Sequence, residues 1–107
     1  MPYIIVQCWY PTDVNIEVVE KYFEILKEFP FDRSLGKETI PVTSNTNKNG
    51  VEIITAMEVK QGKLEEAWTW VGKRIGGMQT VKGFEYEIRL WSTLAEALEG
   101  SEYALPE

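Results

Sequence analysis

Apolar and polar residues alternate most regularly over residues 84–91, with the sequence FEYEIRLW. Side chains of a strand point alternately to opposite faces, so this run predicts a half-buried β-strand. Residues 3–10 are apolar on both sides, which is typical of a strand at the centre of a sheet. Two more strands are predicted over residues 39–46 and 51–60, joined by the polar loop 45–50 and its Asn-Gly turn. Pro41 places the former at an edge, because proline cannot donate to the ladder.

Apolar residues at helical spacing predict a first helix over about residues 14–29, with Thr12 and Asp13 as candidate N-caps. The sequence from Thr93 to Glu96 has the capping-box pattern, in which a threonine is followed three residues later by a glutamate. It predicts a short third helix that ends near Gly100.

A second helix is predicted over residues 64–76. Its apolar stripe places Trp68 in the core and leaves Trp70 to one side. Gly72, inside the helix, costs about 1 kcal/mol relative to alanine and therefore indicates close packing against a neighbour. We expect Gly76 and Gly77 to end the helix with a left-handed cap.

The order of these elements predicts an α+β fold with a split β-α-β arrangement. Right-handed crossovers place the first and third strands at the centre of an antiparallel sheet and both long helices on one face. We expect residues 1–100 to form a single domain and residues 101–107 to form a loose C-terminal tail.

The second face of this predicted sheet has no helix to cover it, yet it carries apolar side chains. Leaving Ile5, Ile54 and Trp9 in water would forgo roughly 1.5–3 kcal/mol each. An apolar patch on an open sheet is typical of an interface or a ligand groove. We therefore predict a homodimer, or a larger oligomer, formed through these faces, with the interface residues Tyr3, Ile5, Ile54 and Ala56.

Polar and aromatic residues on the same face form a candidate ligand-binding site, which consists of Gln7, Trp9, Glu58, Glu87, Arg89 and Trp91. A glutamate desolvated there could transfer a proton, and Gln7 could hydrogen-bond a carbonyl group. In the alternative interpretation, Glu87 and Arg89 form a salt bridge at the rim or face solvent. The two tryptophans could line a pocket for a flat apolar ligand, or pack within the interface.

Composition narrows the classes of function. The net charge of −6, from 11 basic and 17 acidic residues, argues against nucleic acid or an anionic membrane as partner, because both require clustered Lys and Arg. The single cysteine, Cys8, cannot form an internal disulfide, and we expect it to be a small core residue. No apolar run approaches the ~20 residues of a membrane helix, and no signal peptide is recognised, so we expect a cytoplasmic protein. The pattern predicts neither a metal site nor a cofactor.

Three segments resemble the dimeric α+β barrel superfamily, whose ferredoxin-like domains pair through their sheets. They are residues 58–67 (EVKQGKLEEA), 83–88 (GFEYEI) and 91–98 (WSTLAEAL). The resemblance implies a ferredoxin-like βαββαβ sheet with two helices on one face plus a short C-terminal helix, and pairing as a dimeric α+β barrel. Haem-handling members rely on a histidine ligand, and this chain has no histidine, so that activity is not carried over.

The sequence is compatible with two main hypotheses for function. One is a dimeric module that binds a small, partly apolar molecule or simply assembles. The other is a cofactor-free oxygenase or isomerase of the dimeric-barrel type, in which Glu58 or Glu87 would act with Gln7 and Arg89. Whether the protein is an enzyme is left undecided. A third hypothesis is a regulatory domain of the amino-acid-sensing type, because such domains share the same order of strands and helices.

Overall fold

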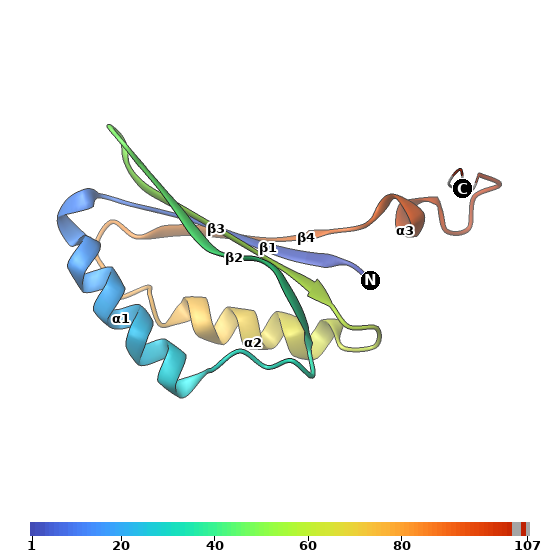
Figure 1. Cartoon of the computed structure of the whole chain (residues 1–107), viewed down its shortest axis with the longest axis horizontal. Coiled ribbons are helices and arrows are strands. Elements are labelled where there is room, and N and C mark those ends of the chain that lie inside the picture. The colour runs from blue at the N-terminus through green and yellow to red at the C-terminus, as the bar shows by residue number, and fades with distance from the viewer. Residues whose placement is uncertain (104–105, 107) are drawn as a thin grey trace.

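The computed structural model describes residues 1–103 and 106. One four-stranded antiparallel sheet has the strand order β2-β3-β1-β4. The strands are β1 (Tyr3–Tyr10), β2 (Gly36–Asn47), β3 (Gly50–Val59) and β4 (Glu85–Trp91). Helices α1 (Asn15–Glu28) and α2 (Leu64–Gly76) both lie on one side of the sheet, as Figure 1 shows. The α+β class, the antiparallel sheet and the shared side of the helices are as predicted.

The strands form where the hydrophobic pattern predicts them. β1 has the expected bounds, and it and β3 occupy the centre of the sheet. β2 lies at an edge, and its pairing with β3 is irregular between Glu38 and Thr43, on both sides of Pro41. Thr55 Oγ1 donates to the Ile40 carbonyl at 2.9 Å, which holds the two strands together beside the irregularity.

The predicted caps of α1 are wrong. Thr12–Val14 form a short 3-10 helix, and Val14 occupies the N-cap position of α1 without a side-chain hydrogen bond. The extra turn shifts the start of the α-helix to Asn15, so Thr12 and Asp13 lie too early to satisfy its first N–H groups.

Helix α2 has the predicted bounds, but its two tryptophans exchange roles. Trp68 is 42% exposed, whereas Trp70 is partly buried and packs edge-to-face on Phe31 with ring centroids 5.5 Å apart. The inward stripe of the helix is centred on Ala67 and Val71, which are both buried. Trp68 instead lines a surface depression together with Leu64 at the start of α2 and Leu90 of β4. The prediction that Trp68 is a core residue is therefore wrong.

The glycines of α2 also differ from expectation. A Cβ added at Gly72 would meet no other element of the described chain within 4 Å, so the predicted close packing there is wrong. The close approach occurs at Gly77 instead, where a Cβ would lie 2.9 Å from Ile25 Cδ1 of α1. Gly77 is right-handed with φ −65°, so the helix does not end with the left-handed cap.

The core lies between the sheet and the helices. Ile4, Val6 and Val59 from the central strands pack against Ala67 and Val71 of α2. Cys8 is buried in the same cluster, and burial raises the pKa of its thiol to about 12. The expectation that Cys8 is a small core residue is confirmed.

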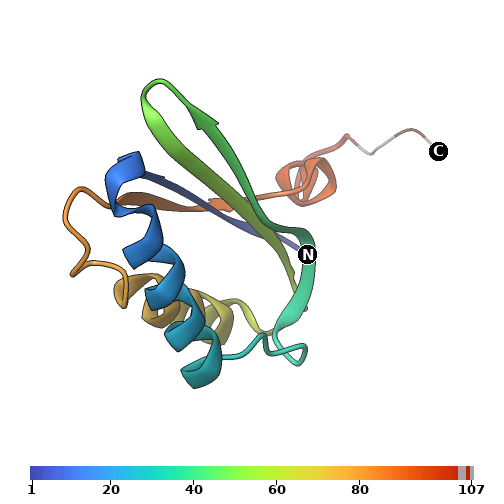
Figure 2. The same ribbon diagram turned by 60° about the vertical axis from the view of Figure 1, so that its left-hand side comes forward.

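Helix α3 (Leu94–Leu98) projects from the body of the molecule, as Figures 1 and 2 show. Its predicted capping box forms: the Glu96 amide donates to Thr93 Oγ1 at 3.2 Å, and the Thr93 amide donates to Glu96 Oε1 at 2.9 Å. The helix ends two residues before the predicted Gly100. Of the predicted loose tail 101–107, residues 101–103 are exposed, and residues 104, 105 and 107 lie outside the described residues.

None of the helices in the described part of the chain is both long and apolar enough to cross a membrane. The cytoplasmic location stays a prediction.

Candidate ligand-binding site

A cavity of about 510 Å³ lies between the helices and the side of the sheet that faces them. Its floor includes Val6 and Ile53 of the central strands, and its walls come from α1, α2 and β2. Val19, Phe23 and Val42 line the cavity and are also exposed, which places its mouth between α1 and β2. Most of the lining is apolar.

The cavity exists because α1 does not cover β2. Tyr10, Val51 and Val81 pack against Val18 and Ile25 of α1, which anchors the helix over the far end of β1 and β3 and the segment that follows α2. The Tyr10 hydroxyl also donates to Asn15 Oδ1 at 2.9 Å, fixing the first turn of the helix. Every residue of β2 after Gly36 is exposed as a result.

Arg74 of α2 contributes the only basic group among the described residues that line the cavity. Its guanidinium carbon lies 4.6 Å from the centre of the Trp70 ring and 6.0 Å from that of Tyr22, and cation–π attraction holds it there. Its Nε is buried and has no hydrogen-bond partner among the described residues. Glu38 of β2 is the only acidic residue among the described residues that line the cavity.

Other polar groups in the lining are mostly engaged. Thr55 is hydrogen-bonded to β2, and Asn15 to Tyr10. Burial raises the pKa of Tyr10, and that of Cys8 to about 12, so both stay protonated at neutral pH. A protonated, buried thiol is a poor nucleophile.

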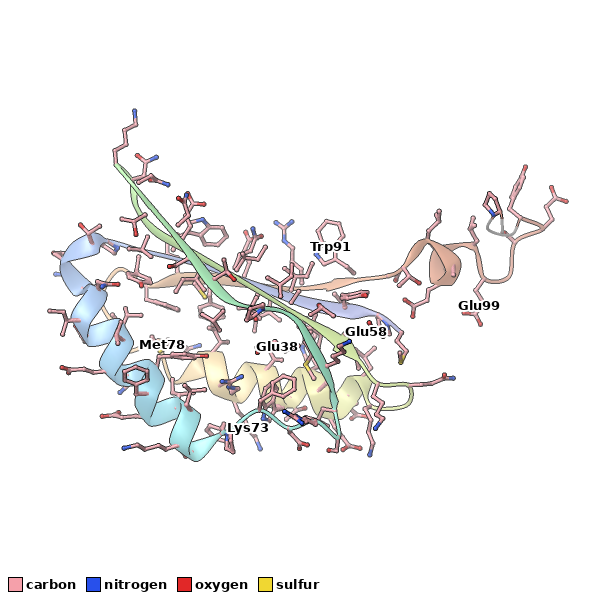
Figure 3. The ribbon with its side chains drawn as sticks, in the orientation of Figure 1. Glu38, Glu58, Lys73, Met78, Trp91 and Glu99 are labelled. Carbon is pink, nitrogen blue, oxygen red and sulfur yellow. The ribbon has the colours of Figure 1, made fainter. Side chains whose placement is uncertain are left out.

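The six site residues predicted from the sequence lie on the opposite face of the sheet. Register places Gln7 of β1 between Ile54 and Glu87, and Trp9 between Glu52 and Glu85. In Figure 3, Trp91 rises from this open face, whereas Glu38 lies toward the helices. The structure thus groups the predicted residues on one face, but none of them lines the cavity.

Polar contacts on the open face satisfy several of these groups within the chain. Glu87 Oε2 lies 2.7 Å from Arg89 Nη2, and both side chains are about half exposed. This is the rim salt bridge of the alternative interpretation, and pairs so exposed contribute little to stability. The Tyr3 hydroxyl donates to Glu58 Oε2 at 3.1 Å, and this bond to a carboxylate raises the pKa of Tyr3.

The predicted interface residues lie together at the centre of the open face. Ile5 pairs with Ala56, and Ile54 with Gln7, across the β1–β3 ladder. Ala56 is buried within the chain, while Tyr3, Ile5 and Ile54 are half-buried. The dimer itself stays a prediction.

Sequence reasoning missed Arg74, since a basic residue in the last turn of a helix is normally assigned to the helix C-terminus and solvent. The available signal was its spacing. Trp70 and Arg74 are four residues apart and therefore neighbours on one helix face. When a tryptophan and an arginine are neighbours on a helix face turned toward the sheet, the ring can hold the guanidinium by cation–π attraction.

Comparison with known proteins places the chain by fold alone. No protein-family model matches it, and no curated protein matches it. The de novo designed protein Foldit4 superimposes with a TM-score of 0.52 and 13% sequence identity, over 86% of this chain and 96% of that one. A formyltetrahydrofolate deformylase from Pseudomonas putida KT2440 gives a TM-score of 0.45 and 13% identity, over 83% of this chain and 28% of the deformylase. The likeness to Foldit4 shows a small α+β fold with a four-stranded antiparallel sheet.

Proposed function

We propose that this protein is a small-ligand-binding module that holds a largely apolar molecule in the cavity between α1, α2 and the sheet. The observation that carries the proposal is the size and lining of that cavity. Its volume of about 510 Å³ lies within the ~300–1,000 Å³ typical of small-molecule sites, which are mostly apolar with a few placed polar groups.

The cavity is suited to this role because its floor is a rigid part of the sheet and its mouth opens to solvent. The floor consists of central strands whose cross-strand pairs are regular. The mouth lies beside β2, where Val42 and Phe23 offer exposed apolar surface. Covering that surface with a ligand would stabilise the complex by roughly 25 cal/mol for each Å² removed from water.

A binding experiment with a neutral probe tests the proposal. N-phenyl-1-naphthylamine fluoresces strongly only in apolar surroundings, and we expect the wild-type chain to enhance its emission saturably. Val42→Trp places a large ring in the cavity mouth and should weaken binding at least tenfold. Ile40→Trp is the matched control, since Ile40 and Val42 are both 41% exposed on β2 but only Val42 lines the cavity. Absence of saturable binding to the wild type, or equal losses in both variants, would contradict the proposal.

A specific observation also favours assembly through the open face. Ile5, Ile54 and Tyr3 form a half-buried apolar strip there, which a second copy would cover. We propose that the chain is ferredoxin-like and pairs as a dimeric α+β barrel. Read from the other edge, the strand order is β4-β1-β3-β2, and both long helices leave the open face free for pairing. Such a dimer would leave the cavity accessible, because the two surfaces lie on opposite faces of the sheet.

The alternative function, a cofactor-free oxygenase or isomerase, has less support. It requires Glu87 or Glu58 as a base in an enclosed site. Glu87 is instead paired with Arg89 in a half-exposed position, and Glu58 accepts a hydrogen bond from Tyr3. Both carboxylates are therefore already engaged by groups of the same chain at the surface, which leaves the ligand-binding proposal as the better supported one.

A further inference from the structure

Arg74 is held in a way that leaves part of its hydrogen-bonding capacity unused. The ring faces of Trp70 and Tyr22 fix the guanidinium, at 4.6 Å and 6.0 Å from their centroids. Ion pairs among the described residues involve other side chains, and Nε is buried without a partner. No carboxylate of the described residues pairs with this guanidinium, so a cation in the lining of an apolar cavity is available to an anionic group from outside the chain.

We infer that the ligand of the cavity is an amphipathic acid, a molecule with a carboxylate at one end and an apolar body. This inference rests on the proposed function and specifies the ligand class for the same site. The carboxylate accepts hydrogen bonds from the two terminal nitrogens of Arg74, in the bidentate geometry that guanidinium and carboxylate share. The apolar body extends over Ile53 and Val42 toward the mouth.

The charge of the surroundings makes this recognition selective. The chain carries a net charge of −6, which repels anions in general, so a bound acid depends on a local cation. Glu38 is the acidic residue of the lining, and it lies across the cavity on β2. Its carboxylate opposes a second negative charge, which favours a monoanion with a neutral body over a dianion.

The experiment compares 4-phenylbutyrate with its neutral analogue 4-phenylbutanamide. The two probes share an apolar body and differ in the charge of the head group. We expect the wild-type chain to bind the acid about tenfold to a hundredfold more tightly than the amide, the range a charged hydrogen-bonded pair supports. Arg74→Gln should abolish this preference, because it removes the cation and leaves a neutral polar side chain in its place. Glu38→Gln should strengthen binding of the acid only.

A second measurement does not depend on the Arg74 variant being folded. The Nε–H resonance of Arg74 in the wild-type chain should move on addition of the acid and stay in place with the amide. Equal affinity for both probes, or an acid preference that survives Arg74→Gln, overturns the inference while the binding of N-phenyl-1-naphthylamine keeps the proposed function. Failure of all three probes to bind overturns both.

Discussion

At the scale of the residue, Gly72 inside α2 and Gly77 directly after it allow the effect of helix propensity to be measured apart from the effect of packing. Gly72 lies inside the helix and a Cβ there would meet open space, so Gly72→Ala should raise the free energy of unfolding by roughly 0.5–1 kcal/mol. Gly77→Ala should give no such gain, because its Cβ would lie 2.9 Å from Ile25 Cδ1. Urea unfolding of the two variants measures the difference. A destabilised Gly72→Ala variant would reveal a neighbour at that position.

Single residues also show where sequence reasoning reached its limit. The buried character of Cys8 follows from the apolar strand around it, and the structure confirms it. The roles of Trp68 and Trp70 did not follow in the same way, since helical spacing placed Trp68 on the apolar stripe of α2 and Trp70 beside it. Phe31, from a loop far along the chain, contacts Trp70, and that contact is not encoded in the helical spacing.

At the scale of the element, strands and helices were predictable within a few residues, because alternation and helical spacing are local properties. The position of α1, which leaves β2 uncovered, was not predictable. It depends on Ile25 meeting Gly77 and on Val18 meeting Tyr10, which are contacts between distant segments. The cavity follows from this position of α1, so the local patterns gave no sign of it, and the site residues predicted from them share the open face instead.

Helix α3 has only five residues, and we expect its capping box to be what maintains it. The pKa of Glu96 is lowered, chiefly because its carboxylate accepts the Thr93 amide hydrogen bond. A lowered pKa means that this cap is fully present above the ordinary glutamate pKa and is lost as the pH falls through the lowered value. NMR titration should show the α3 amide shifts changing with the Glu96 carboxyl group. Thr93→Pro removes the donor and should raise the pKa of Glu96, whereas Thr93→Ala should raise it less. A Glu96 pKa unchanged by Thr93→Pro would contradict this account.

At the scale of the whole molecule, the sheet separates two surfaces for which we propose different tasks. The face toward the helices contains the cavity and Arg74, and the open face contains the apolar strip around Ile5 and Ile54. Since the central strands β1 and β3 contribute to both faces, a stable dimer would also brace the floor of the cavity. Ligand binding and assembly are nevertheless separable, because no residue of the strip lines the cavity.

Sedimentation of the wild-type chain at micromolar concentration should show twice the monomer mass, because pairing removes Ile5 and Ile54 from water on both copies. Ile5→Lys or Ile54→Lys places a charge at the centre of the interface and should convert the dimer to a monomer. Ile16→Lys is the control, since Ile16 is 74% exposed on α1, on the other side of the sheet. Circular dichroism confirms that each variant is folded. A wild-type chain that sediments as a monomer up to about 100 μM, a concentration at which even a weak micromolar dimer would form, would exclude pairing through this face. The cavity and its preference for an acid would then be properties of a single chain.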